Sequence, residues 1–129
     1  YFFIGQHMES IFKKMFIKPG MKLAFADKDG ILEPYLRNQS IVELVEKDAD
    51  VVMGLVLSLK DVDNCIELLK LKRKKGSNIW LVYPKATKTL KPDINRDILF
   101  AYTQDKHQLI ANGNIALDES YSMLRFKDL

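Results

Sequence analysis

Six residues of this chain have the side chains or the backbone freedom to bind an anion or a small ligand, and they are Asp27, Asp29, Gly30, Lys85, Thr87 and Arg96. All lie in segments that follow a run of apolar residues, the pattern of a buried strand. In open α/β sheets, ligands bind beyond the carboxyl ends of the strands. The sequence therefore predicts a candidate anion or ligand pocket at that edge, made of two groups of residues.

The first group is the turn Asp27-Lys28-Asp29-Gly30, which has two carboxylates directly after an apolar run. One or two carboxylates, together with water and a phosphate, are enough to hold Mg²⁺, and Ca²⁺ also takes oxygen ligands. The alternative is a solvated turn, because Asp-Gly is a common turn sequence. We favour the solvated turn and predict no metal site.

The second group surrounds the start of a predicted helix, with Asp93 as its N-cap. Lys85 and Thr87 follow an apolar run, and Arg96 lies just after Asp93. Free N–H groups at a helix N-terminus favour anions, so these three side chains would complete an anion pocket there. In the alternative, Lys85 pairs with Asp93 or Asp97 and only fixes the loop.

No residue has the pattern of a catalytic nucleophile or base. Cys65 and Trp80 fall on apolar faces and are expected in the core. His107 has no Ser, Cys or carboxylate pattern around it and is expected at the surface, where a strand starts. With one Cys and two His in the chain, Cys-based zinc sites are excluded and His-rich sites are not expected. We predict no catalytic residue.

Three near-continuous apolar runs must position these residues, and they span 21–26, 51–57 and 79–83. Runs without alternation are typical of parallel strands that are covered on both faces by helices. Between the second and third runs, residues 58–61 have the S-x-x-D form of a capping box, and apolar residues at 62, 65, 66 and 69 share one helical face. Cations at 72–75 suit the end of this helix, and Gly76 supplies its stop. The crossover should be right-handed.

Shorter elements complete the predicted fold. Helices are expected over 9–16, over 32–38 and from Asp93, the last with Ile94, Ile98, Ala101 and Tyr102 on one face. Residues 41–45 form either a short edge strand or no strand, because a parallel crossover to Val51 needs about a dozen residues. Residues 109–126 read as an antiparallel hairpin with a bulge suggested at Gly113.

The predicted fold class is therefore α/β: one Rossmann-like domain, with a mostly parallel sheet flanked by helices and closed by the C-terminal antiparallel hairpin. Residues 1–7 resemble an expression-tag remnant, the alternative being a short native apolar stretch, so the domain is placed at 8–129. A length of 129 residues suits one domain. Because there is neither a signal-peptide pattern nor an apolar run of about 20 residues, we expect a cytoplasmic protein without a membrane partner.

Charge does not point to nucleic acid. The net charge is +3, although residues 70–91 carry eight Lys or Arg and no acid. A basic stripe could follow a phosphate backbone, but no recognition motif accompanies it. Most of these cations are explained by a solvated helix C-terminus, where positive side chains interact favourably with the helix dipole. A nucleic-acid partner is not expected.

Several stretches resemble the S-adenosylmethionine-dependent methyltransferases, and they are Lys-Pro-Gly-Met-Lys-Leu at 18–23, Asp-Val-Val-Met at 50–53 and Gly-Ser-Asn-Ile-Trp at 76–80. Three further stretches are similar to a bacterial family of small uncharacterised proteins, which resemble methyltransferases with part of the fold deleted, and they are 80–85, 93–97 and 122–126. The resemblance covers residues 10–127. It implies a methyltransferase-like Rossmann fold and no activity that can be carried over.

The cofactor loop of such enzymes is not matched. A nucleotide or S-adenosylmethionine site needs glycines after the first strand, so that the backbone can approach the ligand. Here that loop has one glycine and two carboxylates, and only Glu46 is a candidate to hold a ribose. We expect a non-catalytic binding or protein-interaction module without a cofactor, with a homodimer as a hypothesis because a terminal hairpin has an edge to protect. The alternative is a methyltransferase-like enzyme that binds a small molecule or anion at the carboxyl ends of the strands.

Overall fold

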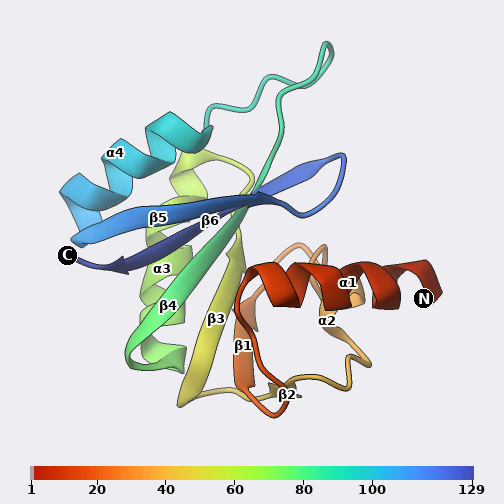
Figure 1. Ribbon diagram of the computed structural model, residues 1–129. Coiled ribbons are helices and arrows are strands. Elements are labelled where there is room, and N and C mark those ends of the chain that lie inside the picture. Colours follow the sequence, from red (N-terminus) through yellow and green to blue (C-terminus); the bar gives the residue numbers. More distant parts are fainter. Residues whose placement is uncertain (1) are drawn as a thin grey trace.

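A six-stranded sheet runs through the molecule, with two helices on each face (Figure 1). The computed structural model describes residues 2–129, with side chains from His7 onward. The order across the sheet is β2 (Glu43–Leu44), β1 (Lys22–Ala26), β3 (Ala49–Leu55), β4 (Arg73–Pro84), β6 (Tyr121–Asp128) and β5 (Leu109–Ala116). The first four strands in this order are parallel, and β6 is antiparallel to both β4 and β5. The predicted α/β class and the closing hairpin are confirmed.

The helices divide the core into two layers. The elements are α1 (Phe2–Lys14), α2 (Glu33–Leu36), the 3-10 turn η1 (Leu59–Asp61), α3 (Val62–Lys72) and α4 (Arg96–His107). One layer packs α1 and α2 on the face of the sheet that carries Trp80, and the other packs α3 and α4 on the face that carries Ile79. Because both faces are covered, the central strands can be apolar along their whole length.

A glycine in β3 allows α3 to lie against the sheet. A Cβ at Gly54 would stand 2.3 Å from the Cys65 Sγ and 2.8 Å from the Leu69 Cδ1, both shorter than any ordinary contact. Cys65 is only 7% exposed and Trp80 only 1%, so both predicted core positions are confirmed. The absence of a side chain at Gly54 therefore lets the Cys65 and Leu69 side of α3 pack directly on β3.

The helix between β3 and β4 ends earlier than the sequence predicts. It stops at Lys72, and Arg73 already pairs with Ala49 as the first residue of β4. The Arg73 guanidinium also binds Asp128 at 2.7 Å, so tertiary contacts draw the cations out of the helix. Gly76, with φ of +84°, lies inside β4 at an irregular register rather than at the helix end.

The predicted capping box is also wrong. The Ser58 hydroxyl donates to the Asp61 carboxylate at 3.2 Å, and neither side chain caps a helix N–H group. The two side chains thus bind each other across η1, and the S-x-x-D pattern does not distinguish this contact from a capping box.

The predicted start of α4 needs a correction of two residues. Asn95, and not Asp93, is the N-cap, and its Oδ1 accepts the Ile98 N–H at 2.9 Å. The buried face is Leu99, Thr103 and His107, whereas Ile98 is 39% exposed. Of the predicted face, Ile94 is buried and Tyr102 packs against the core, whereas Ile98 and Ala101 are exposed. The periodicity misses Thr103 and His107 because these two buried positions are polar.

The uncertain segment at 41–45 contains the short edge strand β2. It pairs only with the first residues of β1, in the register Lys22 with Glu43 and Leu23 with Leu44. Since β2 is two residues long, it ends close to the level at which β3 begins, and residues 45–48 are enough to pass to the other side of β1.

The C-terminal hairpin contains the expected irregularity. Its register shifts between Ala111 and Gly113, so Asn112 is the extra residue. The Arg125 side chain of β6 donates to the Asn112 Oδ1 at 2.8 Å and to its carbonyl oxygen at 3.0 Å. The same guanidinium lies 5.6 Å from the centre of the Phe16 ring and 5.7 Å from that of Trp80, which ties the bulge to the core.

The tag prediction for residues 1–7 stays a prediction. Tyr1 and the side chains of residues 1–6 lie outside the part that the structure describes, and the backbone from Phe2 is the first part of α1. Among the described residues, none of the helices has both the length and the apolar character needed to cross a bilayer.

Candidate functional site

The predicted site lies where the parallel strands β1, β3 and β4 end, at the carboxyl edge of the sheet. The loop after β1 contains Asp27, Asp29 and Gly30, and the segment after β3 leads into η1. The connection from β4 to α4 contains Lys85 and Thr87, and it projects from the molecule at the top of Figure 1. The polar contacts of each segment decide what this edge can bind.

The carboxylate of Asp27 is turned back onto its own loop. Its Oδ1 accepts the Ile31 N–H and its Oδ2 accepts the Glu33 N–H, both at 2.8 Å. Gly30 has a φ of +72°, which the turn requires, and its N–H donates to the Asp27 carbonyl at 3.2 Å. Asp29 is exposed. Asp27 therefore acts as a cap for the first turn of α2, and this arrangement supports the solvated-turn interpretation.

A second carboxylate covers the start of η1. The Asp93 Oδ1 accepts the Leu59 N–H at 2.9 Å, although 34 residues separate the two. Beside it, the Lys28 ammonium donates to the Asp61 carboxylate at 2.9 Å, and this hydrogen bond is the main reason that the pKa of Asp61 lies below its usual value. Backbone N–H groups at helix starts are the usual anion sites of such folds, and here Asp93 already binds one.

The structure does not bring Lys85, Thr87 and Arg96 into contact with one another among the residues it describes. The Lys85 ammonium donates to the Asp118 carbonyl at 2.7 Å, so its predicted pairing with Asp93 or Asp97 is wrong.

Thr87 and Arg96 bind residues close to them in the sequence. The exposed Thr87 hydroxyl accepts the Leu90 N–H at 2.9 Å in the projecting loop. The exposed Arg96 side chain lies 3.4 Å from the carboxylate of its neighbour Asp97.

The turn of the C-terminal hairpin closes the edge beside β4. Asp118, in this turn, accepts a hydrogen bond from the Tyr35 hydroxyl, and the His7 ring contacts the Leu117 carbonyl. Burial, and then the hydrogen bond to Asp118, raise the pKa of Tyr35 well above its usual value, so this phenol stays protonated. Helices α1 and α2 are thereby joined to the hairpin across the ends of the strands.

Glu46, the candidate for ribose binding, lies at the other edge of the sheet. It follows β2, which pairs with the beginning of β1, and its carboxylate lies 3.2 Å from the Lys72 ammonium at the end of α3. Because α3 runs back from the carboxyl edge, its last residue marks the amino edge. Glu46 thus lies beside the Lys72 end of α3, whereas the Asp27 loop lies beside the Asp61 end, and the groove described next runs between these two ends.

A groove lies between α3 and the end of β1. It has a volume of about 390 Å³, and its lining includes Ala26, Leu55, Cys65, Leu68 and the Lys28–Asp61 pair. Burial raises the pKa of the Cys65 thiol to about 12, so this sulfur is a protonated, apolar part of the wall rather than a nucleophile. No group of three or more His, Cys, Asp or Glu side chains in the described chain is arranged to hold a metal ion.

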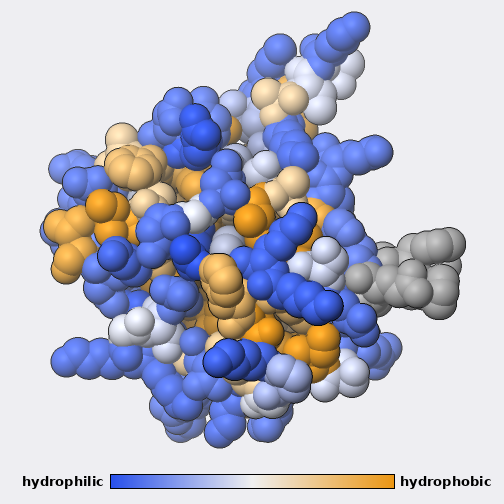
Figure 2. Space-filling view, in the orientation of Figure 1, coloured by the Kyte–Doolittle hydropathy of each residue, from blue (hydrophilic) through white to orange (hydrophobic). Residues whose placement is uncertain are grey.

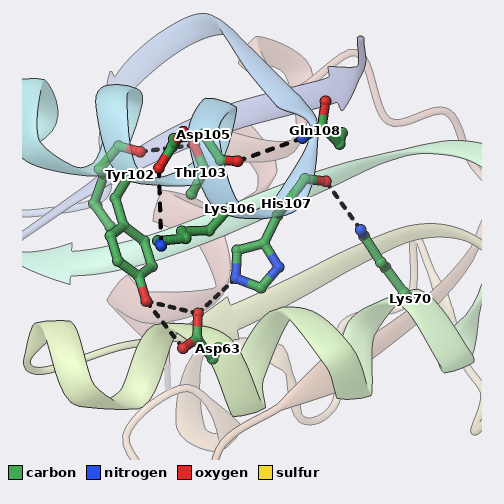
Figure 3. A network of polar contacts seen from close by, with 9 residues as sticks. Asp63, Lys70, Tyr102, Thr103, Asp105, Lys106, His107 and Gln108 are labelled. Atoms are coloured by element: carbon green, nitrogen blue, oxygen red, sulfur yellow. Dashed lines mark hydrogen bonds and ion pairs between the residues drawn. The ribbon is translucent and has the colours of Figure 1, made fainter.

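One polar cluster was missed by the sequence analysis. Figure 3 shows Tyr102 and His107 of α4 pointing toward Asp63 of α3. The His107 Nε2 lies 2.6 Å from the Asp63 carboxylate, and the Tyr102 hydroxyl donates to the same carboxylate at 2.9 Å. These two hydrogen bonds, that of His107 foremost, hold the pKa of Asp63 below its usual range.

This cluster joins two helices rather than forming a reactive centre. His107 is 8% exposed and ends α4, so its prediction as a surface residue at a strand start is wrong. The Lys70 ammonium also donates to the His107 carbonyl at 3.1 Å. The spacing of Tyr102 and His107, five residues apart, carries no signal without the position of Asp63, which only the packing of α3 on α4 supplies.

No family model and no curated protein matches the chain, whereas solved structures do. A methyltransferase from Aquifex aeolicus, described as dependent on S-adenosylmethionine, aligns with a TM-score of 0.60 at 9% identity over 94% of this chain and 89% of its own. The magnesium protoporphyrin IX methyltransferase from Synechocystis aligns with a TM-score of 0.58 at 7% identity over 98% and 81%. An N-methyltransferase from Bradyrhizobium japonicum gives a TM-score of 0.54 at 8% identity over 95% and 85%. The chain thus has the Rossmann-like fold of the S-adenosylmethionine-dependent methyltransferases, as its sequence resemblance predicts.

Proposed function

We propose that this chain is a non-catalytic binding module that keeps the methyltransferase-like fold and has given up its cofactor site. One observation carries the proposal: Asp27 and Asp93 place their own carboxylates on backbone N–H groups at the carboxyl edge. A ligand would have to displace these contacts, and an anionic group would also meet two carboxylates there.

The position of Glu46 supports the same proposal. Its carboxylate is paired with the Lys72 ammonium, at the far end of α3 from the loop that follows β1, where enzymes of this fold bind their ligand. The ion pairs of the basic run also weaken the case for a nucleic-acid module, because three of its eight cations, Lys72, Arg73 and Lys74, each pair with a carboxylate. These pairs leave protein surfaces as the best-supported class of partner.

Titration calorimetry with S-adenosylmethionine and S-adenosylhomocysteine tests the proposal. We expect no heat of binding and no change in melting temperature with about 1 mM ligand, whereas a ligand at 100 times its Kd adds about 2.7 kcal/mol of stability. Saturable binding of either ligand would refute the proposal if Asp27→Ala changes it and the matched variant Asp29→Ala leaves it intact. It would favour the methyltransferase-like alternative at this edge.

A further inference from the structure

One edge of the sheet has almost none of the features that prevent edges from pairing with other chains. Natural edge strands are usually short, charged, interrupted by proline or covered. The β2 edge follows this rule, because it is two residues long and carries Glu43, with Glu46 and Lys47 close behind. The β5 edge is eight residues long, and residues 108–117 contain neither a charge nor a proline.

The composition of β5 is that of an interior strand. Charged residues make up 29% of the chain, and the comparable charge-free runs are 51–59 and 76–84. Those runs belong to β3 and β4, each of which is paired along both sides. β5 has the same lack of charge but is paired only with β6. A charge-free strand with an open side is suited to a second pairing.

The bulge at Asn112 interrupts only part of the unpaired side of β5. Arg125 holds the Asn112 side chain and carbonyl toward β6, so the extra residue is satisfied within the hairpin. Beyond it the register with β6 is regular from Gly113 to Ala116. Since hydrogen-bonding directions alternate along a strand and Leu117 donates to the Tyr121 carbonyl, the backbone groups of Asn114 and Ala116 face outward.

The helix beside this edge begins with the charged pair Arg96 and Asp97 and is free of charge from Ile98 to Gln104. The exposed residues Phe100, Ala101 and Gln104 share the flank of α4 that faces away from α3. A hollow of about 350 Å³ lies between α4 and β5, and its lining includes Phe100, Gly113 and Asn114 together with the charged side chains of Arg96 and Asp97. Figure 1 places the start of β5 and the C-terminus at the left of the view. In the same region, Figure 2 shows hydrophobic side chains at the surface.

We propose that β5 is a self-association edge, on which a second copy of this chain adds its own β5 in antiparallel register about a two-fold axis. The inference rests on the proposed function, for which it names the partner. A second copy fits because two identical charge-free strands oppose each other without an unpaired charge. The two-fold axis also places both α4 flanks on the same face of the joined sheet.

The available area suits a dimer of moderate affinity. The regular part of β5 from Gly113 to Ala116 gives an edge about 14 Å long at about 3.4 Å for each residue, and the whole strand one of about 27 Å; a sheet layer plus a helix layer add about 15–20 Å of depth. The resulting contact of about 200–550 Å² for each copy is below the roughly 800 Å² of a standard interface. We therefore expect dissociation in the micromolar range.

Sedimentation equilibrium of the whole chain up to about 100 µM tests the inference. We expect a species of twice 14.9 kDa, in equilibrium with monomer. Ala116→Lys and Asn114→Lys put an exposed cation on each edge, opposite its copy, and should weaken the dimer at least tenfold without lowering the melting temperature by more than about 2 °C. The matched control is Leu44→Lys on the β2 edge, which should leave the dimer intact.

Hydrogen exchange gives a second measurement that does not depend on a variant. The amides of Asn114 and Ala116 should exchange slowly at high protein concentration and quickly on dilution. A chain that is monomeric at about 100 µM refutes the inference, and it does so even if the β5 edge of that monomer binds an extended peptide. A dimer that persists in both lysine variants also refutes it. None of these outcomes reports on S-adenosylmethionine binding, so the dimer and the proposed function can fail separately.

Discussion

Gly54→Ala tests the contact that sets the position of α3. The new methyl group would lie 2.3 Å from the Cys65 Sγ and 2.8 Å from the Leu69 Cδ1. Overpacking of this kind costs about 1–3 kcal/mol, and the lower entropy of the unfolded alanine variant returns about 0.4–1 kcal/mol. We expect a net loss of about 1–2 kcal/mol in the free energy of unfolding, which corresponds to a fall of about 4–8 °C in melting temperature.

A double-mutant cycle assigns this loss to one pair of atoms. Cys65→Ala removes the Sγ and alone should cost about 1 kcal/mol through lost burial. The variant with both substitutions should be about as stable as Cys65→Ala, because the alanine methyl then has room and Leu69 can move the end of its side chain. The coupling energy should therefore be about 1–2 kcal/mol, measured by urea unfolding followed by circular dichroism.

Gly113→Ala is the matched control, since its new Cβ would meet only the flexible end of Arg125 at 3.3 Å. We expect it to change the free energy of unfolding by less than about 0.5 kcal/mol. Additive effects of Gly54→Ala and Cys65→Ala would refute the packing argument. So would a Gly54→Ala variant as stable as the original chain.

Three further predictions follow from contacts in the candidate site. Asp27→Ala removes two acceptors for backbone N–H groups and should lower stability by about 1–2 kcal/mol in urea unfolding, while Asp29→Ala should leave it unchanged. Because the pKa of Asp63 is lower in the folded chain, this carboxylate stabilises the fold above its unfolded pKa near 3.9, and the stabilisation is lost as the pH falls through the folded pKa. The melting temperatures of the original chain and of Asp63→Asn should therefore converge in acid. A difference in melting temperature that does not change with pH would contradict the contact. Cys65, with a pKa of about 12, should not react with a thiol reagent at pH 8 until the chain unfolds, and rapid labelling of the folded chain would show that the sulfur is accessible.

The central sheet could be predicted because its signal is local. The runs at 21–26, 51–57 and 79–83 contain no charged side chain except Lys22, near the start of the first. Each run forms a strand in the parallel part of the sheet. The hairpin was equally readable from alternation and turn residues. In these segments side-chain type and final burial agree, so composition alone carries the information.

The errors fall where distant residues decide the outcome. Arg73 leaves the helix because Asp128 and Ala49, on two other strands, hold it. Asp93 is not an N-cap because its carboxylate accepts the hydrogen bond of the distant Leu59 N–H group. Lys85 binds the backbone of Asp118, and a backbone acceptor leaves no trace in a pattern of side chains. The candidate site could thus be placed at the correct edge of the sheet, but its internal contacts could not be predicted.

The strand order has a consequence for synthesis of the chain. β6 follows β5 in sequence but lies between β4 and β5, so it is inserted into the sheet rather than added at its side. While a ribosome is still translating residues 85–120, the apolar residues 79–83 of β4 have no partner along that side. Domains generally fold as units, and unpaired apolar strands are prone to aggregate. A chain interrupted before Tyr121 would lack the partner strand for this side of β4 and would expose it to other chains.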